Sequence, residues 1–185
     1  MVITMDKQIF IINGSGGVGK DSFIEILSEN YWTLCTVGNY SSVSKVKRIA
    51  KEIGWDGSKT ERDRKFLSDL KLLTTAYNDM PLNDMKEVAE NFMYGKNKIP
   101  RMMFLHIREP EEIAKAVDAF KEYNAKTILV KRDSVKHITS NMADENVYNY
   151  GYDIVINNNG TLNDLEIVAK TFLDDFLHDT LKDEY

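Results

Sequence analysis

The sequence has little cysteine, no long apolar run and no excess of positive charge. Its one cysteine, Cys35, has no partner within the chain, so no internal disulfide is possible and we expect a reducing cytoplasm. The longest apolar runs, such as 102–105, fall far short of the roughly 20 residues that a membrane helix needs. The first residues, MVITMDKQ, have none of the features of a secretion signal. We therefore expect a cytoplasmic protein that does not enter membranes.

The charge balance is acidic. A net charge of −5 argues against general affinity for nucleic acid or anionic membranes, so an anionic ligand must be held by a local site. A length of 185 residues with 43% hydrophobic and 29% charged residues is typical of one folded domain, and we treat 1–185 as a single domain.

Short apolar segments alternate with amphipathic ones along the chain. Strands are predicted at 8–12, 32–37, 101–107, 126–130 and 153–157. Helices are predicted at 20–29, from Ser41 or Ser42 to 53, at 61–78 after the cap Thr60, and at 81–94, 111–123 and 162–181. Strands that alternate with helices favour an α/β fold with three layers and a central parallel sheet. The block 41–95 contains no convincing strand and is predicted to be a helical insertion over one edge of the sheet.

A glycine-rich loop follows the first predicted strand. The sequence GSGGVGK, residues 14–20, fits the G-x-x-x-x-G-K pattern and lies between an apolar strand and an amphipathic helix. In such a loop backbone amides turn toward phosphate and the lysine reaches the β and γ oxygens. We therefore predict that the loop binds ATP, although a glycine-rich turn without nucleotide remains the alternative. The predicted nucleotide-binding residues of the loop are Gly14, Gly16, Gly17, Gly19 and Lys20.

The residue after the lysine is Asp21, where such loops usually carry a Ser or Thr that binds Mg²⁺. A carboxylate beside bound phosphates is tolerable where it contacts the metal or points away. Asp21 is therefore a candidate metal ligand, and Ser22 is a second one that can supply the hydroxyl. The alternative is that Asp21 only stabilises the first turn of the helix through its dipole.

The sequence GKDS is similar to the GKD[ST] variant of phage-type deoxynucleoside monophosphate kinases and phosphomevalonate kinases. These belong to the nucleoside monophosphate kinase-like group of P-loop proteins, which also includes dephospho-CoA kinase. The segment MMFLHIREPEEI resembles the central strand and following turn of these kinases, and YDIVINNNGTLNDL resembles their last strand and the turn after it. The resemblance implies an ATP- and Mg²⁺-dependent kinase with a small phosphorylated acceptor.

Arg108 stands at the predicted carboxyl end of a central strand, where ligands bind in parallel sheets. The resemblance implies that it contacts the acceptor phosphate or the transferring group; the alternative is an ion pair with Glu111 or Glu112. Two places earlier, where the phage-type relatives often have an aspartate, this chain has His106. We expect His106 to serve packing, so that Glu109 or Asp21 would supply the missing carboxylate.

The block 41–95 resembles the acceptor-binding arm of these kinases. Lys45 and Arg48 are three residues apart, so they share one helical face and can both point at a phosphate. Arg62 and Arg64 follow the segment GWDGSK. We expect at least one of these bases to contact the acceptor, with Arg48 and Arg64 as first choices, although each alone also fits a solvated surface charge.

Residues 132–146 correspond to the lid of these kinases. Arg132 and Lys136 are placed to close over the triphosphate, and the turn Asn158–Gly160 is placed either beside the adenine or simply at the entry to the last helix. The sequence thus predicts a kinase acting first on a nucleoside or deoxynucleoside monophosphate. The alternative is a nucleotide-binding regulatory module of degenerate kinase fold.

Overall fold

The computed structural model describes residues 7–95, 99–135 and 146–182. Its centre is one sheet of five strands in the order β2-β3-β1-β4-β5, and every neighbouring pair is parallel. The strands are β1 Lys7–Asn13, β2 Thr36–Ser41, β3 Arg101–His106, β4 Lys126–Lys131 and β5 Ile154–Asn157. The predicted α/β class with a parallel central sheet is therefore confirmed.

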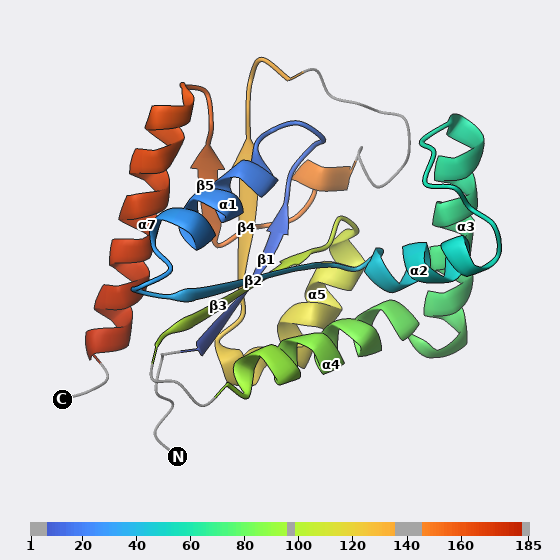
Figure 1. The fold of residues 1–185 in the computed structure, drawn as a ribbon, viewed down its shortest axis with the longest axis horizontal. Coiled ribbons are helices and arrows are strands. Elements are labelled where there is room, and N and C mark those ends of the chain that lie inside the picture. The colour runs from blue at the N-terminus through green and yellow to red at the C-terminus, as the bar shows by residue number, and fades with distance from the viewer. Residues whose placement is uncertain (1–6, 96–98, 136–145, 183–185) are drawn as a thin grey trace.

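Helices cover both faces of this sheet (Figure 1). They are α1 Lys20–Asn30, α2 Ser44–Glu52, α3 Glu61–Asn78, α4 Met80–Met93, α5 Pro110–Ala119 and α7 Leu162–Lys182, with 3-10 turns η1 Lys121–Tyr123 and η2 Asn146–Tyr148. None of the helices described is both long and apolar enough to cross a membrane.

The middle of the central strand β1, residues 9–12, is entirely apolar because this part is buried on both faces of the sheet. Successive side chains point to opposite faces of a strand, so Phe10 and Ile12 enter a core with α1 and α7, whereas Ile9 and Ile11 enter a second core with α4 and α5. Two cores on either side of one sheet make a three-layer arrangement, which is compatible with a P-loop-type fold.

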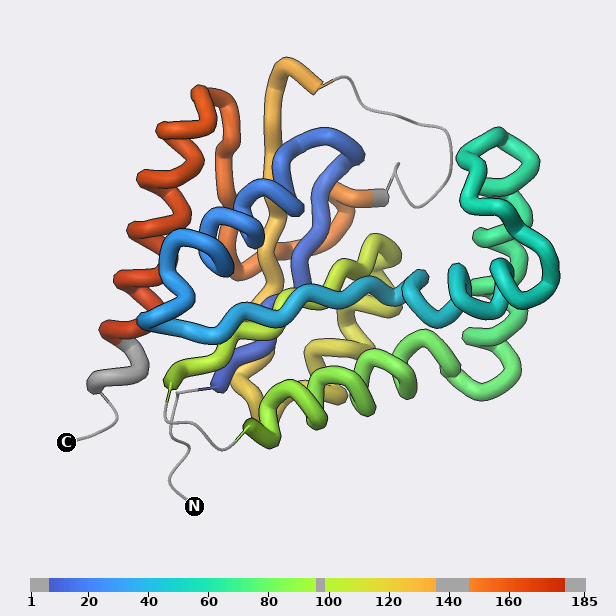
Figure 2. Tube along the Cα trace, viewed as in Figure 1, coloured from blue at the N-terminus to red at the C-terminus, as the bar shows by residue number. Residues whose placement is uncertain are grey.

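The arm follows β2 and consists of α2, α3 and α4. Figure 2 shows α2 and α3 projecting past the carboxyl ends of the strands, while α4 returns along the sheet and packs on β2 and β3. The predicted cap of α3 is confirmed: Asp63 N donates to the Thr60 side chain at 3.2 Å, and Thr60 N donates to Asp63 Oδ2 at 3.1 Å. The helical insertion over one edge of the sheet is present as predicted.

Three local predictions are wrong. The strand predicted at 32–37 begins only at Thr36, because Trp32 and Leu34 are exposed in a turn closed by bonds to the Tyr31 carbonyl. Neither Ser41 nor Ser42 caps α2; Val43 is the cap residue, and no side chain caps this helix end.

The third error concerns the helix predicted at 111–123. It ends at Ala119 and continues as the 3-10 turn η1, after which Asn124 takes a left-handed φ of 46°. Asparagine tolerates that conformation better than most residues, so it ends the helical segment one residue before Ala125 and the strand β4.

Candidate active site

The glycine-rich loop joins β1 to α1 at the carboxyl end of the sheet, as predicted. A Cβ at Gly14, where φ is 144°, would clash with the carbonyl oxygen of Val130, and one at Gly19, where φ is 97°, would clash with the Asn158 amide. Gly17 also has a positive φ of 81°, but a Cβ there would meet nothing within 4 Å. The loop is therefore packed closely against Val130 and Asn158 but is open at Gly17, which leaves room for an anion against its backbone. Gly16 lies beside this opening and is half-buried.

Two buried asparagines hold the loop in place. Asn13 accepts a hydrogen bond from Gly14 N at 2.8 Å, and its amide donates to the Arg108 carbonyl at 3.1 Å and to the Tyr152 hydroxyl at 2.7 Å. Asn158 donates to the Val18 carbonyl at 2.8 Å. Burial raises the pKa of Tyr152 to about 12, so its hydroxyl stays protonated at neutral pH.

Lys20 lies over the loop that it ends. Its Nζ donates to the carbonyl oxygens of Gly14 and Ser15 at 2.6 and 2.8 Å. The Ser15 hydroxyl is buried and has no hydrogen-bond partner among the described residues. A buried polar group without a partner is unusual. The orphaned hydroxyl, the open Gly17 and the lysine together fit a bound phosphate.

Asp21 is the second residue of α1, beside the loop, and its side chain is 79% exposed. Its Oδ1 lies 3.8 Å from Nε2 of His106, the last residue of β3, which pairs with Ile12 of β1. His106 is largely buried, as a packing role requires, but its ring also faces this carboxylate. Ser22, the other predicted metal ligand, is half-buried in the first turn of the same helix.

Burial lowers the pKa of His106 to about 4. The Asp21 charge opposes this shift, whereas the charges of Lys20 and Arg108 add to it. The imidazole is therefore neutral at physiological pH, and it lies among two cations and one carboxylate. The structure thus brings together four of the residues that the sequence singled out.

Arg108 lies two residues after the end of β3 and is exposed. The next residue, Glu109, is engaged by Lys71 of α3, whose Nζ lies 2.5 Å from Glu109 Oε2 and 2.7 Å from Glu112 Oε2. Burial raises the pKa of Glu109, but the charge and hydrogen bond of Lys71 outweigh it and hold the pKa low; burial raises the pKa of Glu112. Glu109, a candidate for the missing metal carboxylate, is therefore bonded to a lysine of the arm. Glu112, a candidate partner of Arg108, is bonded to the same lysine.

Lys45 and Arg48 share one face of α2, as their spacing predicts, and both reach Asp84 of α4. The Asp84 Oδ1 atom lies 2.9 Å from Arg48 Nη2 and 3.5 Å from Lys45 Nζ. The Tyr40 hydroxyl donates to the other oxygen of this buried carboxylate at 2.8 Å. Arg48 nevertheless remains 59% exposed, so it can bind a further anion.

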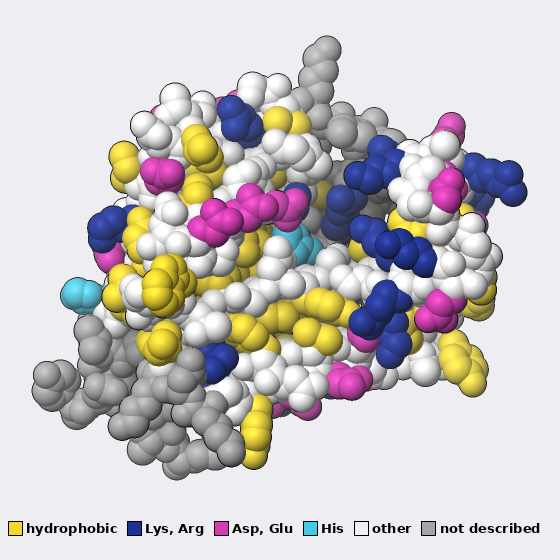
Figure 3. Space-filling model, in the orientation of Figure 1, with side chains coloured by type: hydrophobic (Ala, Val, Ile, Leu, Met, Phe, Trp, Pro, Cys, Tyr) yellow, Lys and Arg dark blue, Asp and Glu magenta, His cyan; other side chains and the backbone are white. Residues whose placement is uncertain are grey.

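Arg62 and Arg64 lie elsewhere in the arm, at the exposed start of α3, where Arg64 Nε donates to the Lys59 carbonyl at 3.2 Å. Figure 3 shows lysine and arginine side chains gathered on the α2 and α3 side of a hollow in this face of the molecule. The arm therefore presents a basic surface toward the end of the sheet that carries the loop.

The predicted lid is described only in part, because residues 136–145, which include Lys136, lie outside the described ranges. Arg132 donates from Nε to the Ser134 hydroxyl at 3.3 Å. It lines a cavity of about 320 Å³ at the end of β4, together with Lys131, Asp133, Val135 and Tyr148. Asn159 bonds Asp133 at 2.7 Å and so ties the turn after β5 to this cavity.

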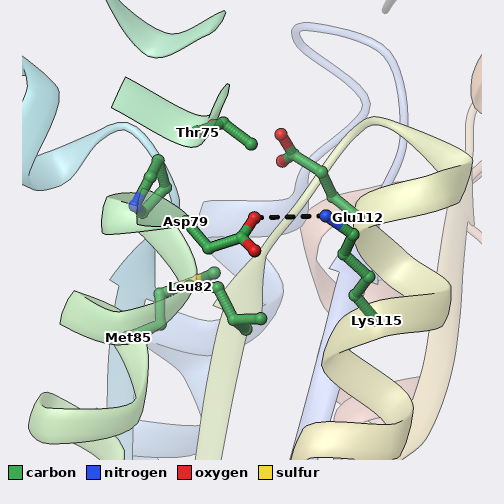
Figure 4. Close-up of a pocket in the computed structure, with 7 residues that line it drawn as sticks. Thr75, Asp79, Leu82, Met85, Glu112 and Lys115 are labelled. Atoms are coloured by element: carbon green, nitrogen blue, oxygen red, sulfur yellow. Dashed lines mark hydrogen bonds and ion pairs between the residues drawn. The ribbon is translucent and has the colours of Figure 1, made fainter. Parts of the chain in front are cut away.

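A second hollow lies between α4 and α5 (Figure 4). Its volume is about 10 Å³, which is room for about one water molecule. Lys115 and Asp79 close one side of it with an ion pair of 3.1 Å, and the Thr75 hydroxyl there is buried without a partner among the described residues. It is too small for a substrate.

Sequence reasoning missed Asn13, Lys71 and Asp84. Two of them had a signal: Asn13 follows directly on the apolar run of β1, and Asp84 interrupts the buried face of an amphipathic helix. Lys71 is one of two lysines in α3, and only the tertiary structure distinguishes it from the other. Among the side chains described, no group of three or more metal-ligating residues is present.

Comparison with known proteins adds little to this site. No protein-family model matches the chain, and no curated protein matches it. Among solved structures, it is similar to the tunicamycin resistance protein of Deinococcus radiodurans, with a TM-score of 0.46 and 12% sequence identity, over 90% of this chain and 95% of that one. A likeness this distant does not bear on the chemistry of the site.

Proposed function

We propose that this protein is an ATP- and Mg²⁺-dependent kinase that phosphorylates a small phosphorylated acceptor, with a nucleoside or deoxynucleoside monophosphate as the first choice. One observation carries the proposal: the loop with Lys20 lies at the same end of the sheet as the basic surface of α2 and α3. Phosphoryl transfer needs two anionic substrates held in line while their charge is neutralised, and such an arrangement meets that need.

The nucleotide side of the proposal rests on the loop. Backbone amides from Gly14 to Gly19 would hold the β and γ phosphates, and Lys20 would exchange its two carbonyl partners for phosphate oxygens. Asp21 or Ser22 would hold the divalent ion, which neutralises phosphate charge when bound. Arg132 would contact the nucleotide from the cavity at the end of β4.

The acceptor side rests on the arm. Lys45 and Arg48 converge on Asp84, which fixes their position while leaving Arg48 largely exposed. Arg108 would face the transferring group from the end of β3, and Arg64 would reach the acceptor from α3. Dephospho-CoA and phosphomevalonate fit the same mechanism, because their phosphate would meet the same bases.

A second candidate function is a nucleotide-binding module of degenerate kinase fold. The observation that favours it is His106, a neutral side chain beside Asp21 at a position where the related kinases often carry an aspartate. Such a module would bind ATP but transfer no phosphate.

The test is ADP production from ATP with a divalent ion across nucleoside monophosphates, deoxynucleoside monophosphates, dephospho-CoA and phosphomevalonate. We expect one acceptor to stimulate turnover, and Lys20→Ala to lower it by about 10³-fold or more, because the lysine stabilises developing charge. Lys170→Ala, at an exposed lysine of α7 that pairs with Asp174, is the matched control and should leave turnover unchanged.

Two results would contradict the proposal. Normal turnover in folded Lys20→Ala would remove the lysine from the mechanism. A flat response to every acceptor, together with ATP binding, would favour the module without transfer activity.

A further inference from the structure

Asp21 and His106 present an oxygen and a nitrogen to the same small volume beside the phosphate loop. Their nearest atoms, Oδ1 and Nε2, are 3.8 Å apart, which is too long for a hydrogen bond. Two ligands of one ion, each about 2.1 Å from it, can be up to about 4.2 Å apart. The observed separation falls within that limit, so the two side chains can reach a single divalent ion.

The two side chains also have the mobility and surroundings that such a site needs. Asp21 is exposed and can adjust its rotamer, whereas His106 is fixed at the end of β3 with only 17% of its side chain exposed. No hydrogen bond from the described residues engages the His106 ring. The nearby charges of Lys20 and Arg108 disfavour a bare cation, so an ion would arrive with the negative charge of a nucleotide.

The choice of ligand atoms decides which ion is favoured. Mg²⁺ prefers oxygen ligands in octahedral geometry, whereas imidazole nitrogen favours first-row transition ions. The carboxylate that would restore an all-oxygen site, Glu109, is bonded to Lys71 instead. A site built from one carboxylate, one imidazole and phosphate oxygens is therefore a mixed oxygen and nitrogen site.

We propose that Asp21 and His106 together bind the divalent ion of the nucleotide, and that His106 shifts the preference of this site from Mg²⁺ toward a first-row transition ion such as Mn²⁺. This inference rests on the proposed function, because the ion is the one that accompanies the nucleotide. His106 is then a specificity-determining residue for the metal.

The first experiment measures the affinity of a non-hydrolysable ATP analogue by calorimetry, once with Mg²⁺ and once with Mn²⁺. We expect the wild type to bind the analogue more tightly with Mn²⁺ than with Mg²⁺. In His106→Asp this preference for Mn²⁺ should fall by about tenfold or more, because substitutions around a bound metal typically change its affinity by at least about that factor. His178→Gln, at an exposed histidine of α7, is the matched control and should keep the wild-type ratio.

The second experiment needs no variant and so does not depend on the folding of His106→Asp. Electron paramagnetic resonance of Mn²⁺ with the analogue should show coupling to a ¹⁴N nucleus, and this coupling should change when the protein is labelled with ¹⁵N-histidine. His178→Gln should retain the coupling, and a folded His106→Asp protein should lose it.

The outcomes separate this inference from the proposed function. Tight analogue binding with Mn²⁺, but without a histidine nitrogen coupling, overturns the inference and leaves the kinase proposal standing. Coupling that persists in His106→Asp also overturns it, because another histidine would then bind the ion. Failure to bind the analogue with either ion overturns both.

Discussion

Lys71 offers the sharpest test of how the arm is joined to the active site. Its side chain is 7% exposed, and its ammonium group lies between the carboxylates of Glu109 and Glu112, whose side chains are 35% and 20% exposed. The substitution Lys71→Met keeps most of the apolar stem and removes the charge, so both carboxylates lose their compensating cation.

The expected loss of stability can be estimated from these exposures. Breaking a buried ion pair by removing one partner costs about 3–5 kcal/mol. The partly exposed glutamates can regain some water, so we expect the lower end, about 3 kcal/mol. In a domain of this size, that lowers the melting temperature by roughly 6–12 °C.

The assay is chemical denaturation followed by circular dichroism at pH 7. The triple substitution Lys71→Met, Glu109→Gln and Glu112→Gln should recover most of the loss, because no uncompensated charge remains. Lys65→Met, which breaks an exposed pair six residues earlier on α3, should change the free energy of unfolding by less than about 0.5 kcal/mol.

The pH dependence provides a second check with a definite sign. Without Lys71, burial raises the pKa of both glutamates above their values in the unfolded chain, so the folded variant binds more protons and its deficit relative to the wild type shrinks as the pH falls toward 5. A loss below about 1 kcal/mol at pH 7, or a deficit that grows toward acid pH, would refute this account of the buried charges.

Two further predictions concern Asp84 and Cys35. Asp84→Asn weakens the positioning of Lys45 and Arg48. In steady-state kinetics the KM for the acceptor should therefore rise about tenfold, a loss of about 1.4 kcal/mol in acceptor binding, with kcat little changed. A KM equal to that of the exposed control Glu87→Gln would contradict this prediction. Burial raises the pKa of Cys35 to about 11, so at pH 8 only about 0.1% is thiolate and a disulfide reagent should label it slowly until the protein unfolds. The buried neutral thiol contributes fully to the free energy of unfolding below pH 9, and this contribution is lost as the pH rises toward 11. Cys35→Ala should abolish this pH dependence. Rapid labelling of the folded protein at pH 8 would contradict the prediction, because it would show that the thiol is accessible.

The sequence predicted best those parts that depend on local patterns. The loop GSGGVGK, the Thr60 cap and the apolar strand β1 each have a signature within a few residues, and each lies where it was predicted. The edge strand β2 was placed too early, because an edge strand pairs on one side only and can be largely polar, while the apolar residues before it lie exposed in a turn. The local pattern of apolar and polar residues cannot distinguish a polar edge strand from an apolar segment that is exposed in a turn.

The candidate site was predictable in its location but not in its pairings. The carboxyl ends of parallel strands meet at one edge, so Lys20 and Asp21 after β1 lie close to His106 and Arg108 at the end of β3. Which carboxylate binds which cation depends on how α3 and α4 pack against the sheet. The pairs Lys71 with Glu109 and Arg48 with Asp84 join residues 38 and 36 positions apart, and no local pattern indicates them.

These long-range pairs place Arg108 between two anchors. Its carbonyl accepts a hydrogen bond from Asn13, the residue that also holds the first glycine of the phosphate loop. Its neighbour Glu109 is bonded to Lys71 of the arm. A displacement of α3 would therefore pull on the backbone next to Arg108, whereas the loop holds that backbone from the other side. In a reaction that needs donor and acceptor in line, the arginine between them is positioned by both the element proposed to bind the nucleotide and the element proposed to bind the acceptor.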